Sequence, residues 1–158
     1  HLQSRKIKIV AGSFSMLHSL DRLSLAEKLE RALAEIDRVL PVLLEVNVSG
    51  EESKNGWPAW EESLWPGLRT DVERLLQFPH LQIEGLMTMP PLFDNPEGVR
   101  PFFRKTRILR DALAKTFPQA SWRHLSMGTS GDFPAAVQEG ATFVRVGTAI
   151  MGARPPRN

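Results

Sequence analysis

Short β-rich segments alternate with amphipathic helical segments along almost the whole chain, and this alternation restricts the fold more than any other feature. The strand-like segments are residues 15–20, 42–48, 81–87, 121–125 and 142–146, and the helical patterns between them are residues 23–40, 69–77, 99–117 and 134–139. Such an α/β alternation indicates a parallel sheet, because each parallel connection needs a crossover of helical length. The pattern predicts either an open doubly wound sheet or a (β/α)8 barrel.

The start of the first helical segment and the absence of a dinucleotide motif refine this expectation. Ser24 and Glu27 have the spacing of a capping box, so we expect Ser24 to cap the helix that Pro41 ends. No GxGxxG motif opens a helical segment, which disfavours the dinucleotide-binding version of the open sheet. In either fold, functional groups lie at the carboxyl ends of the strands.

The composition is that of one globular domain and argues against several classes of protein. The chain has 158 residues, 42% of them hydrophobic, with no apolar run of membrane-spanning length and no recognisable secretory leader. Cysteine is absent, which removes disulfides, thiolate catalysis and Cys-type zinc sites. The net charge of +2 is small and the basic residues are scattered. We therefore expect a cytoplasmic protein that contacts neither membrane nor nucleic acid.

A strand followed by a loop of small polar residues forms the first candidate site, between Leu125 and Pro134. Backbone N–H groups of the loop and of the next helix would face an anion together, and glycines would allow its close approach. Asp132 is expected to cap that helix. The residues of this candidate cradle are Ser126, Gly128, Thr129, Ser130 and Gly131. Alone, the segment fits an ordinary polar turn equally well.

The last strand-like segment carries the second candidate site. Arg145 lies within a β-branched run, where a charged side chain requires a partner. Gly147 and Thr148 then repeat the combination of a small residue and a hydroxyl group. Phosphate sites formed after the last two strands recur in (β/α)8 barrels. Together the two loops predict a phosphate site, and a barrel that binds a sugar phosphate would satisfy the same pattern.

Several motifs, taken together, resemble the pyridoxal phosphate homeostasis protein family. Residues 126–132 and 140–152 are similar to the family's C-terminal signature, and earlier segments follow the family's order of motifs. Those earlier segments are residues 2–6, 19–22, 47–56 and 85–90. Thr129 departs from the methionine that is usual in the family, and Arg5 departs from a frequent asparagine. The resemblance extends over essentially the whole chain.

The resemblance implies a (β/α)8 TIM barrel of the alanine racemase N-terminal type, with pyridoxal 5′-phosphate (PLP) at its mouth. It implies that residues 1–158 are the C-terminal part of a single PLP-binding domain, an incomplete barrel of about strands 4–8. Arg145 would face the pyridine nitrogen, and Met87 and Asn47 would line the pocket near the ring. The phosphate would lie between Ser126, Gly128, Thr129 and Ser130 on one side and Gly147 and Thr148 on the other.

The resemblance also places the family's Schiff-base lysine at the end of the first barrel strand, outside the strands that this chain matches. The lysines of the chain are Lys6, Lys8, Lys28, Lys54, Lys105 and Lys115. None of them ends a strand-like segment, and Lys28, Lys105 and Lys115 lie in helical segments where solvated lysines are usual. We expect the phosphate cradle without the covalent anchor, in an open sheet with exposed edges.

The function expected from the resemblance is non-catalytic: a monomeric, PLP-binding protein of intracellular PLP homeostasis. Amino or keto acids are further candidate partners, and the alternative is a PLP-dependent, racemase-like enzyme. His18 and His124 are expected to pack within strands, and no cluster of His, Asp or Glu has metal-ligand spacing. Trp57, Trp60 and Trp65 have near-helical spacing and are expected to pack as one helix face on the barrel.

Overall fold

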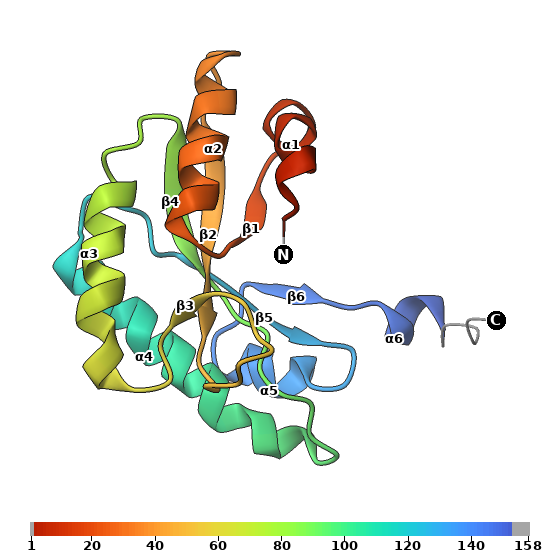
Figure 1. The fold of residues 1–158 in the computed structure, drawn as a ribbon. Helices are drawn as coiled ribbons and strands as arrows, with labels where there is room; N and C mark the ends of the chain where they lie inside the picture. Colours follow the sequence, from red (N-terminus) through yellow and green to blue (C-terminus); the bar gives the residue numbers. More distant parts are fainter. Residues whose placement is uncertain (1, 153–158) are drawn as a thin grey trace.

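A parallel sheet with the strand order β1-β2-β4-β5-β6 is the frame of the computed structural model, which describes residues 2–152 (Figure 1). Its strands are β1 (Leu17–Leu20), β2 (Leu40–Asn47), β4 (Leu81–Met87), β5 (His124–Thr129) and β6 (Phe143–Arg145). The short β3 (Trp57–Pro58) pairs with the end of β2 beside this path. All strand pairs are parallel, so the carboxyl ends of the strands lie along one edge.

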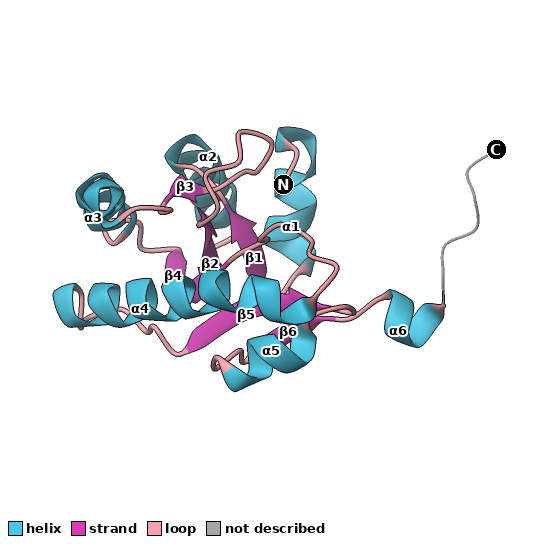
Figure 2. Ribbon diagram, turned by 90° about the horizontal axis from the view of Figure 1, so that it is seen from below, coloured by secondary structure: helices cyan, strands magenta, loops and turns pink. Residues whose placement is uncertain are grey.

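Helices are arranged around the strands, as Figure 2 shows. They are α1 (Ile7–Ser13), α2 (Leu23–Ala34), α3 (Trp65–Leu75), α4 (Arg100–Thr116), α5 (Phe133–Gln138) and α6 (Thr148–Met151). Short 3-10 turns, η1 (Ser4–Lys6), η2 (Glu62–Leu64) and η3 (Pro96–Val99), precede α1, α3 and α4. The last helix, α6, projects away from the sheet in both views. No helix within residues 2–152 is long and apolar enough to cross a membrane.

The predicted alternation of parallel strands and helices is confirmed. Residues 81–87 form a strand with the predicted bounds, and the parallel strands form an open, partial barrel. The periodic apolar side of α2 is buried, which confirms the helical pattern from which it was predicted. His1 and residues 153–158 lie outside the described part of the chain.

Helix α2 is shorter than its sequence pattern, residues 23–40, predicts. It ends at Ala34 rather than Leu40, because Asp37 adopts a positive φ of 48° and the Arg38 N–H donates to the Leu33 carbonyl group. This reversal releases Leu40 to begin β2. Leu40 therefore begins β2, although its spacing also fits the apolar side of the helix.

Two local predictions about helices are wrong. Ser24 is not the N-cap, because α2 already begins at Leu23 and no side chain caps its first turn. Trp57, Trp60 and Trp65 do not share one helix face. Trp57 lies in β3, Trp60 follows it in a bend, and Trp65 begins α3. The near-helical spacing of these residues therefore arises in an irregular segment.

The strand predicted for residues 121–125 lies further along the chain. Trp122 is buried in the loop before β5, where its Nε1–H donates to the Phe117 carbonyl group over 3.0 Å. β5 then runs to Thr129, and Ser126 pairs with both neighbouring strands. Most of the predicted phosphate loop is therefore strand, and the turn after β5 begins only at Ser130.

The helix α4 buries its apolar side against the sheet. Phe103, Leu109 and Leu113 are fully buried in the main core. Removing an apolar side chain of this size from water contributes about 1.5–3 kcal/mol to folding. This packing fixes the start of α4, which lies beside the candidate site.

Gly85 allows β4 and β5 to approach each other closely. The register of β4 against β2 skips Glu84, which marks a bulge immediately before this glycine. The φ of Gly85 is 148°, and a Cβ atom there would overlap the carbonyl oxygen of His124 in β5. The pairing of these two strands therefore depends on the absence of a side chain.

Replacing Gly85 by alanine should separate β4 from β5. We expect Gly85→Ala to lower the free energy of unfolding by about 3 kcal/mol or more, measured by urea denaturation. Gly12→Ala is the matched control, because Gly12 lies in α1 with no atom near its missing Cβ. That control should gain about 0.5–1 kcal/mol from helix propensity. Equal stability of Gly85→Ala and wild type would contradict this account of the strand pairing.

Candidate functional site

Two loops at the carboxyl edge of the sheet line a cavity of about 350 Å³. One loop follows β5 and the other follows β6, and the segment between β4 and α4 forms an apolar side. The residues of the two loops in the lining are Thr129, Ser130, Gly131, Asp132, Arg145, Gly147 and Thr148. The apolar side consists of Leu92, Phe93, Pro96 and Val99. The structure therefore brings the two candidate loops of the sequence together.

The Ser130 hydroxyl group connects the two loops. Its oxygen accepts hydrogen bonds from the backbone N–H groups of Gly147, over 3.0 Å, and Ala149, over 3.2 Å. Both donors lie at the start of α6, where a helix leaves N–H groups without intrahelical acceptors. Across residues 2–152, the N–H groups of Ser130, Gly131 and Thr148 meet no acceptor. The lining thus contains backbone donors that remain available to a ligand.

Arg145 reaches from β6 to a side chain within β5 and to the carbonyl group just after β4. Its Nη1 donates to Ser126 Oγ over 2.7 Å and its Nη2 to the Thr88 carbonyl oxygen over 2.8 Å. Burial lowers the pKa of Arg145, whereas the carboxylates of Glu45 and Asp132 act in the opposite direction. A guanidinium group starts so far above neutrality that it stays protonated. The partners that the sequence pattern requires for this charge are present.

His18 of β1 shares the Ser126 hydroxyl group with Arg145. Its Nδ1 lies 3.0 Å from Ser126 Oγ, and its ring centroid lies 4.9 Å from that of Phe143. Phe143 also contacts His124, with ring centroids 4.7 Å apart. Burial, followed by the charges of Arg145 and His124, lowers the pKa of His18 below 6.5. The predicted packing role of His18 is therefore incomplete, because this ring also belongs to a polar chain.

Four predicted site residues do not line the cavity. Ser126 and Gly128 lie within β5, and Met87 and Asn47 end β4 and β2. We expected Gly128 to give a phosphate room, but its φ is 95° and a Cβ atom there would collide with Ala136 of α5. This glycine allows the helix to pack on the strand. Ligand contacts of these four residues stay predictions.

Asn47 uses its side chain to shape the turn after β2. Its Oδ1 accepts from the N–H groups of Ser49, over 3.1 Å, and Gly50, over 3.0 Å. Its Nδ2 donates to the Glu51 carbonyl oxygen over 3.0 Å. Through these contacts, Asn47 fixes the loop after β2, which lies at the same edge of the sheet as the cavity.

Asp132 stabilises the turn after β5 in a different way from the one predicted. It occupies the N-cap position of α5 but makes no side-chain bond to the helix, so the predicted cap is wrong. Its Oδ1 instead accepts from the backbone N–H of Thr129 and, over 3.0 Å, from the Thr129 hydroxyl group. The carboxylate thereby closes the turn and leaves the N–H groups of Ser130 and Gly131 uncovered.

Glu45 is a buried acid beside the site that the sequence analysis does not single out. It lies within β2, is 6% exposed, and its Oε2 has no hydrogen-bond partner in the described structure. Burial raises the pKa of Glu45, Asp21 raises it further, and Arg145 opposes the shift. The signal was available, since Glu45 interrupts an apolar run as Arg145 does. No described group of three His, Cys, Asp or Glu side chains could hold a metal ion.

Known proteins match the chain over almost its entire length. Residues 3–155 match the family described as alanine racemase, N-terminal domain. The pyridoxal phosphate homeostasis protein of Aquifex aeolicus is 44% identical over 97% of this chain and 64% of its own length. The protein of that name from Synechocystis is 36% identical over 97% of this chain and 67% of its own. The chain belongs to the pyridoxal phosphate homeostasis protein family.

A solved structure with related sequence has the same fold. PipY from Synechococcus elongatus, with PLP bound, matches with a TM-score of 0.85 and 35% identity, over 96% of this chain and 68% of PipY. The α/β fold is therefore that of the alanine racemase N-terminal domain, and the predicted family is confirmed. The chain spans less than two thirds of several curated homeostasis proteins, including 64% of the Aquifex protein and 62% of that from Haemophilus influenzae.

The lowered pKa of His18 makes the stability of the fold depend on pH. Well above pH 6.5 the ring is neutral in both states, but as the pH falls through this value the unfolded chain takes up the proton first and the folded state loses stability. Removing the ring in His18→Asn should therefore reduce the loss of unfolding free energy between about pH 7 and about pH 5. Chemical denaturation at a series of pH values measures this slope.

The shift of Glu45 has the opposite sign, because an acid with a raised pKa adds stability as the pH falls. Glu45 is present both in wild type and in His18→Asn. The difference between the pH dependences of their unfolding free energies is therefore due to His18. Parallel slopes for wild type and His18→Asn would show that the ring titrates equally in both states.

Proposed function

We propose that this chain binds PLP and serves PLP homeostasis without catalysing a reaction. The main support is the cavity at the carboxyl edge, where uncovered backbone N–H groups and the Arg145 guanidinium line one space. Relatives that match the chain are named pyridoxal phosphate homeostasis proteins, and PipY has been solved with PLP bound. These names favour a homeostasis protein over the racemase-like alternative.

The cavity lining fits a phosphate group. Ser130, Gly131 and Thr148 offer backbone N–H groups, and a Cβ atom at Gly131 or Gly147 would meet no atom within 4 Å. Phosphate oxygens could therefore approach the backbone at these positions, as anions do at helix N-termini and glycine-rich loops. Asp132 also lines the cavity, but its Oδ1 accepts the hydrogen bonds of the turn. We assign the phosphate to this end.

Arg145 fits the ring nitrogen of the cofactor. Ser126 and the Thr88 carbonyl group fix its guanidinium, whose permanent charge disfavours protonation of a neighbouring pyridine nitrogen. When bound, PLP supplies an aldehyde and a conjugated ring that can act as an electron sink. Arg145 weakens that sink, which suits a carrier better than a transaminase. We keep Met87 and Asn47, which end β4 and β2, as proposed pocket residues near the ring.

We further propose that β1, β2, β4, β5 and β6 are strands 4–8 of an eight-stranded barrel, within one domain that covers residues 1–158. Support comes from the parallel strand order and from coverage of 64% of the Aquifex relative. The lysines lie in η1 (Lys6), α1 (Lys8), α2 (Lys28), the loop after β2 (Lys54) and α4 (Lys105 and Lys115). None of them lines the candidate cavity, so we propose no covalent anchor in this chain.

Arg145 provides the spectroscopic test of the proposed function. PLP should bind to the chain, and Arg145→Leu should shift the absorbance maximum of bound PLP, because loss of the positive charge favours the pyridinium form. Arg31→Leu, on the exposed part of α2, is the matched control and should leave the spectrum unchanged. Pyridoxal, which lacks the phosphate, should bind at least tenfold more weakly (about 1.4 kcal/mol). Equal affinities for PLP and pyridoxal would remove the phosphate assignment.

Borohydride reduction tests the absence of a covalent anchor. PLP bound to the chain should give no reduced adduct at a specific lysine, because no lysine reaches the cavity lining. Peptide mass spectrometry after reduction makes the measurement, and PipY with PLP serves as a comparison protein. A stoichiometric adduct at one lysine would overturn this part of the proposal.

A further inference from the structure

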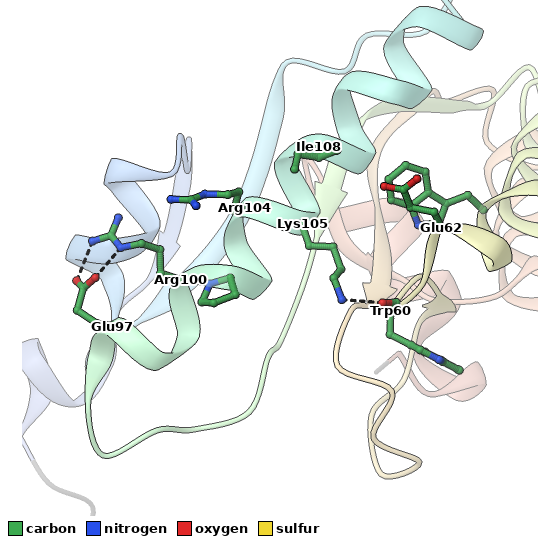
Figure 3. Close-up of a pocket in the computed structure, with 9 residues that line it drawn as sticks. Trp60, Glu62, Glu97, Arg100, Arg104, Lys105 and Ile108 are labelled. Carbon is green, nitrogen blue, oxygen red and sulfur yellow. Dashed lines mark hydrogen bonds and ion pairs between the residues drawn. The ribbon is translucent and has the colours of Figure 1, made fainter.

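A second cavity, of about 400 Å³, lies between α4 and the segment that joins β3 to α3 (Figure 3). Its lining includes Glu97, Arg100 and Pro101, whereas Pro96 and Val99 of the same segment line the proposed PLP cavity. The two cavities therefore share a wall but have different linings. The proposed PLP site does not account for the second cavity.

Aromatic and aliphatic groups form much of the second cavity. Trp65 is 7% exposed and fixed by an Nε1–H bond to the Ala59 carbonyl group. The Trp60 ring packs against the turn at Gly50, where a Cβ atom would lie 3.3 Å from the ring. Pro101 and Ile108 complete the apolar lining from α4, and Ile108 keeps 48% of its surface exposed. Such a surface favours a flat apolar ligand.

The cations on the α4 side differ in how far they are neutralised. Arg100 donates to Glu97 at 2.6 and 2.7 Å, and also to Gln138 and Glu139. Arg104 makes one contact, from Nη2 to Glu139 over 3.1 Å. Its other N–H groups have no acceptor in the described part of the protein. Arg100 is therefore occupied, and the Arg104 guanidinium points toward Glu139 and away from the Lys105 ammonium group (Figure 3).

Lys105 carries the charge that distinguishes this cavity. Its ammonium group donates to the carbonyl oxygens of Trp60, over 2.6 Å, and Val48, over 3.5 Å (Figure 3). Within residues 2–152 it forms no ion pair with a carboxylate. An ammonium group has three donors, so one remains for a ligand. Lys105 lies in a helix as predicted and is partly exposed, but its ammonium group contacts loop carbonyl groups, and its charge remains uncompensated beside an aromatic cavity.

We propose that this second cavity binds a planar aromatic carboxylic acid. The ring would lie against Trp65 and Ile108, and the carboxylate would accept a hydrogen bond from Lys105. Carboxylates form strong, charge-assisted bonds with such donors, particularly beside apolar surface that limits screening by water. Glu62 lines the same cavity and repels an anion, so it limits the affinity.

Titration with 1-naphthoate tests the site, with 1-naphthamide as the uncharged match. We expect Lys105→Met to weaken naphthoate binding about tenfold and to leave naphthamide binding unchanged, because the variant removes a charged donor but keeps most of the apolar side chain. Glu62→Gln should strengthen naphthoate binding. Lys115→Met, on the same helix but outside the cavity, is the matched control and should behave as wild type.

Competition separates the two sites, so that failure of the PLP proposal and failure of this one can be distinguished. PLP should not displace naphthoate, because the two cavities have different linings. Equal binding of naphthoate and naphthamide, equal losses of both in Lys105→Met, or displacement of naphthoate by PLP would each overturn the proposal. Equal losses would show that Lys105 only holds the loop carbonyl groups.

Discussion

The close parallel pairing of β2, β4 and β5 is the constraint on which the other features of this structure depend. Gly85 permits that approach, because any side chain at its position would collide with the backbone of β5. Once the strands pair in this register, their carboxyl ends share one edge, and the loops after β5 and β6 can enclose a cavity. Local backbone geometry in the middle of a strand therefore determines whether a distant pair of loops can form one site.

Arg145 connects the fold to the site. A charge within a strand must find partners, and it finds them in Ser126, within β5, and in the carbonyl group of Thr88, just after β4. The same bonds orient the guanidinium toward the mouth of the partial barrel. His18 extends the chain of polar contacts to β1. The hydrogen bonds that compensate the buried charge of Arg145 therefore also hold its guanidinium in place. We propose that this group recognises the ring nitrogen of PLP.

Sequence patterns predicted the order of elements well and their ends poorly. The strand at residues 81–87 was predictable because a β-rich run lies between clear breaks. Leu40, in contrast, fits helical and strand periodicity equally well, and only its pairing with β4 places it in a strand. The two loops of the site followed from their small polar residues. Ser126 was assigned to a loop because its strand neighbours come from distant parts of the chain. The contacts of Lys105 were not predictable, since helix periodicity does not reveal which loop lies opposite.

The hydrogen bonds of Ser130 have a consequence for how tightly the first cavity can hold any oxygen ligand. Its hydroxyl oxygen already occupies two amides at the start of α6, so the protein carries an internal competitor for those donors. A ligand that uses them must displace this oxygen, and its net gain is the difference between two similar bonds. A ligand that binds the uncovered backbone N–H groups of Gly131 and Thr148 displaces no existing hydrogen bond. The side chain therefore selects among orientations of an incoming anion before that anion arrives.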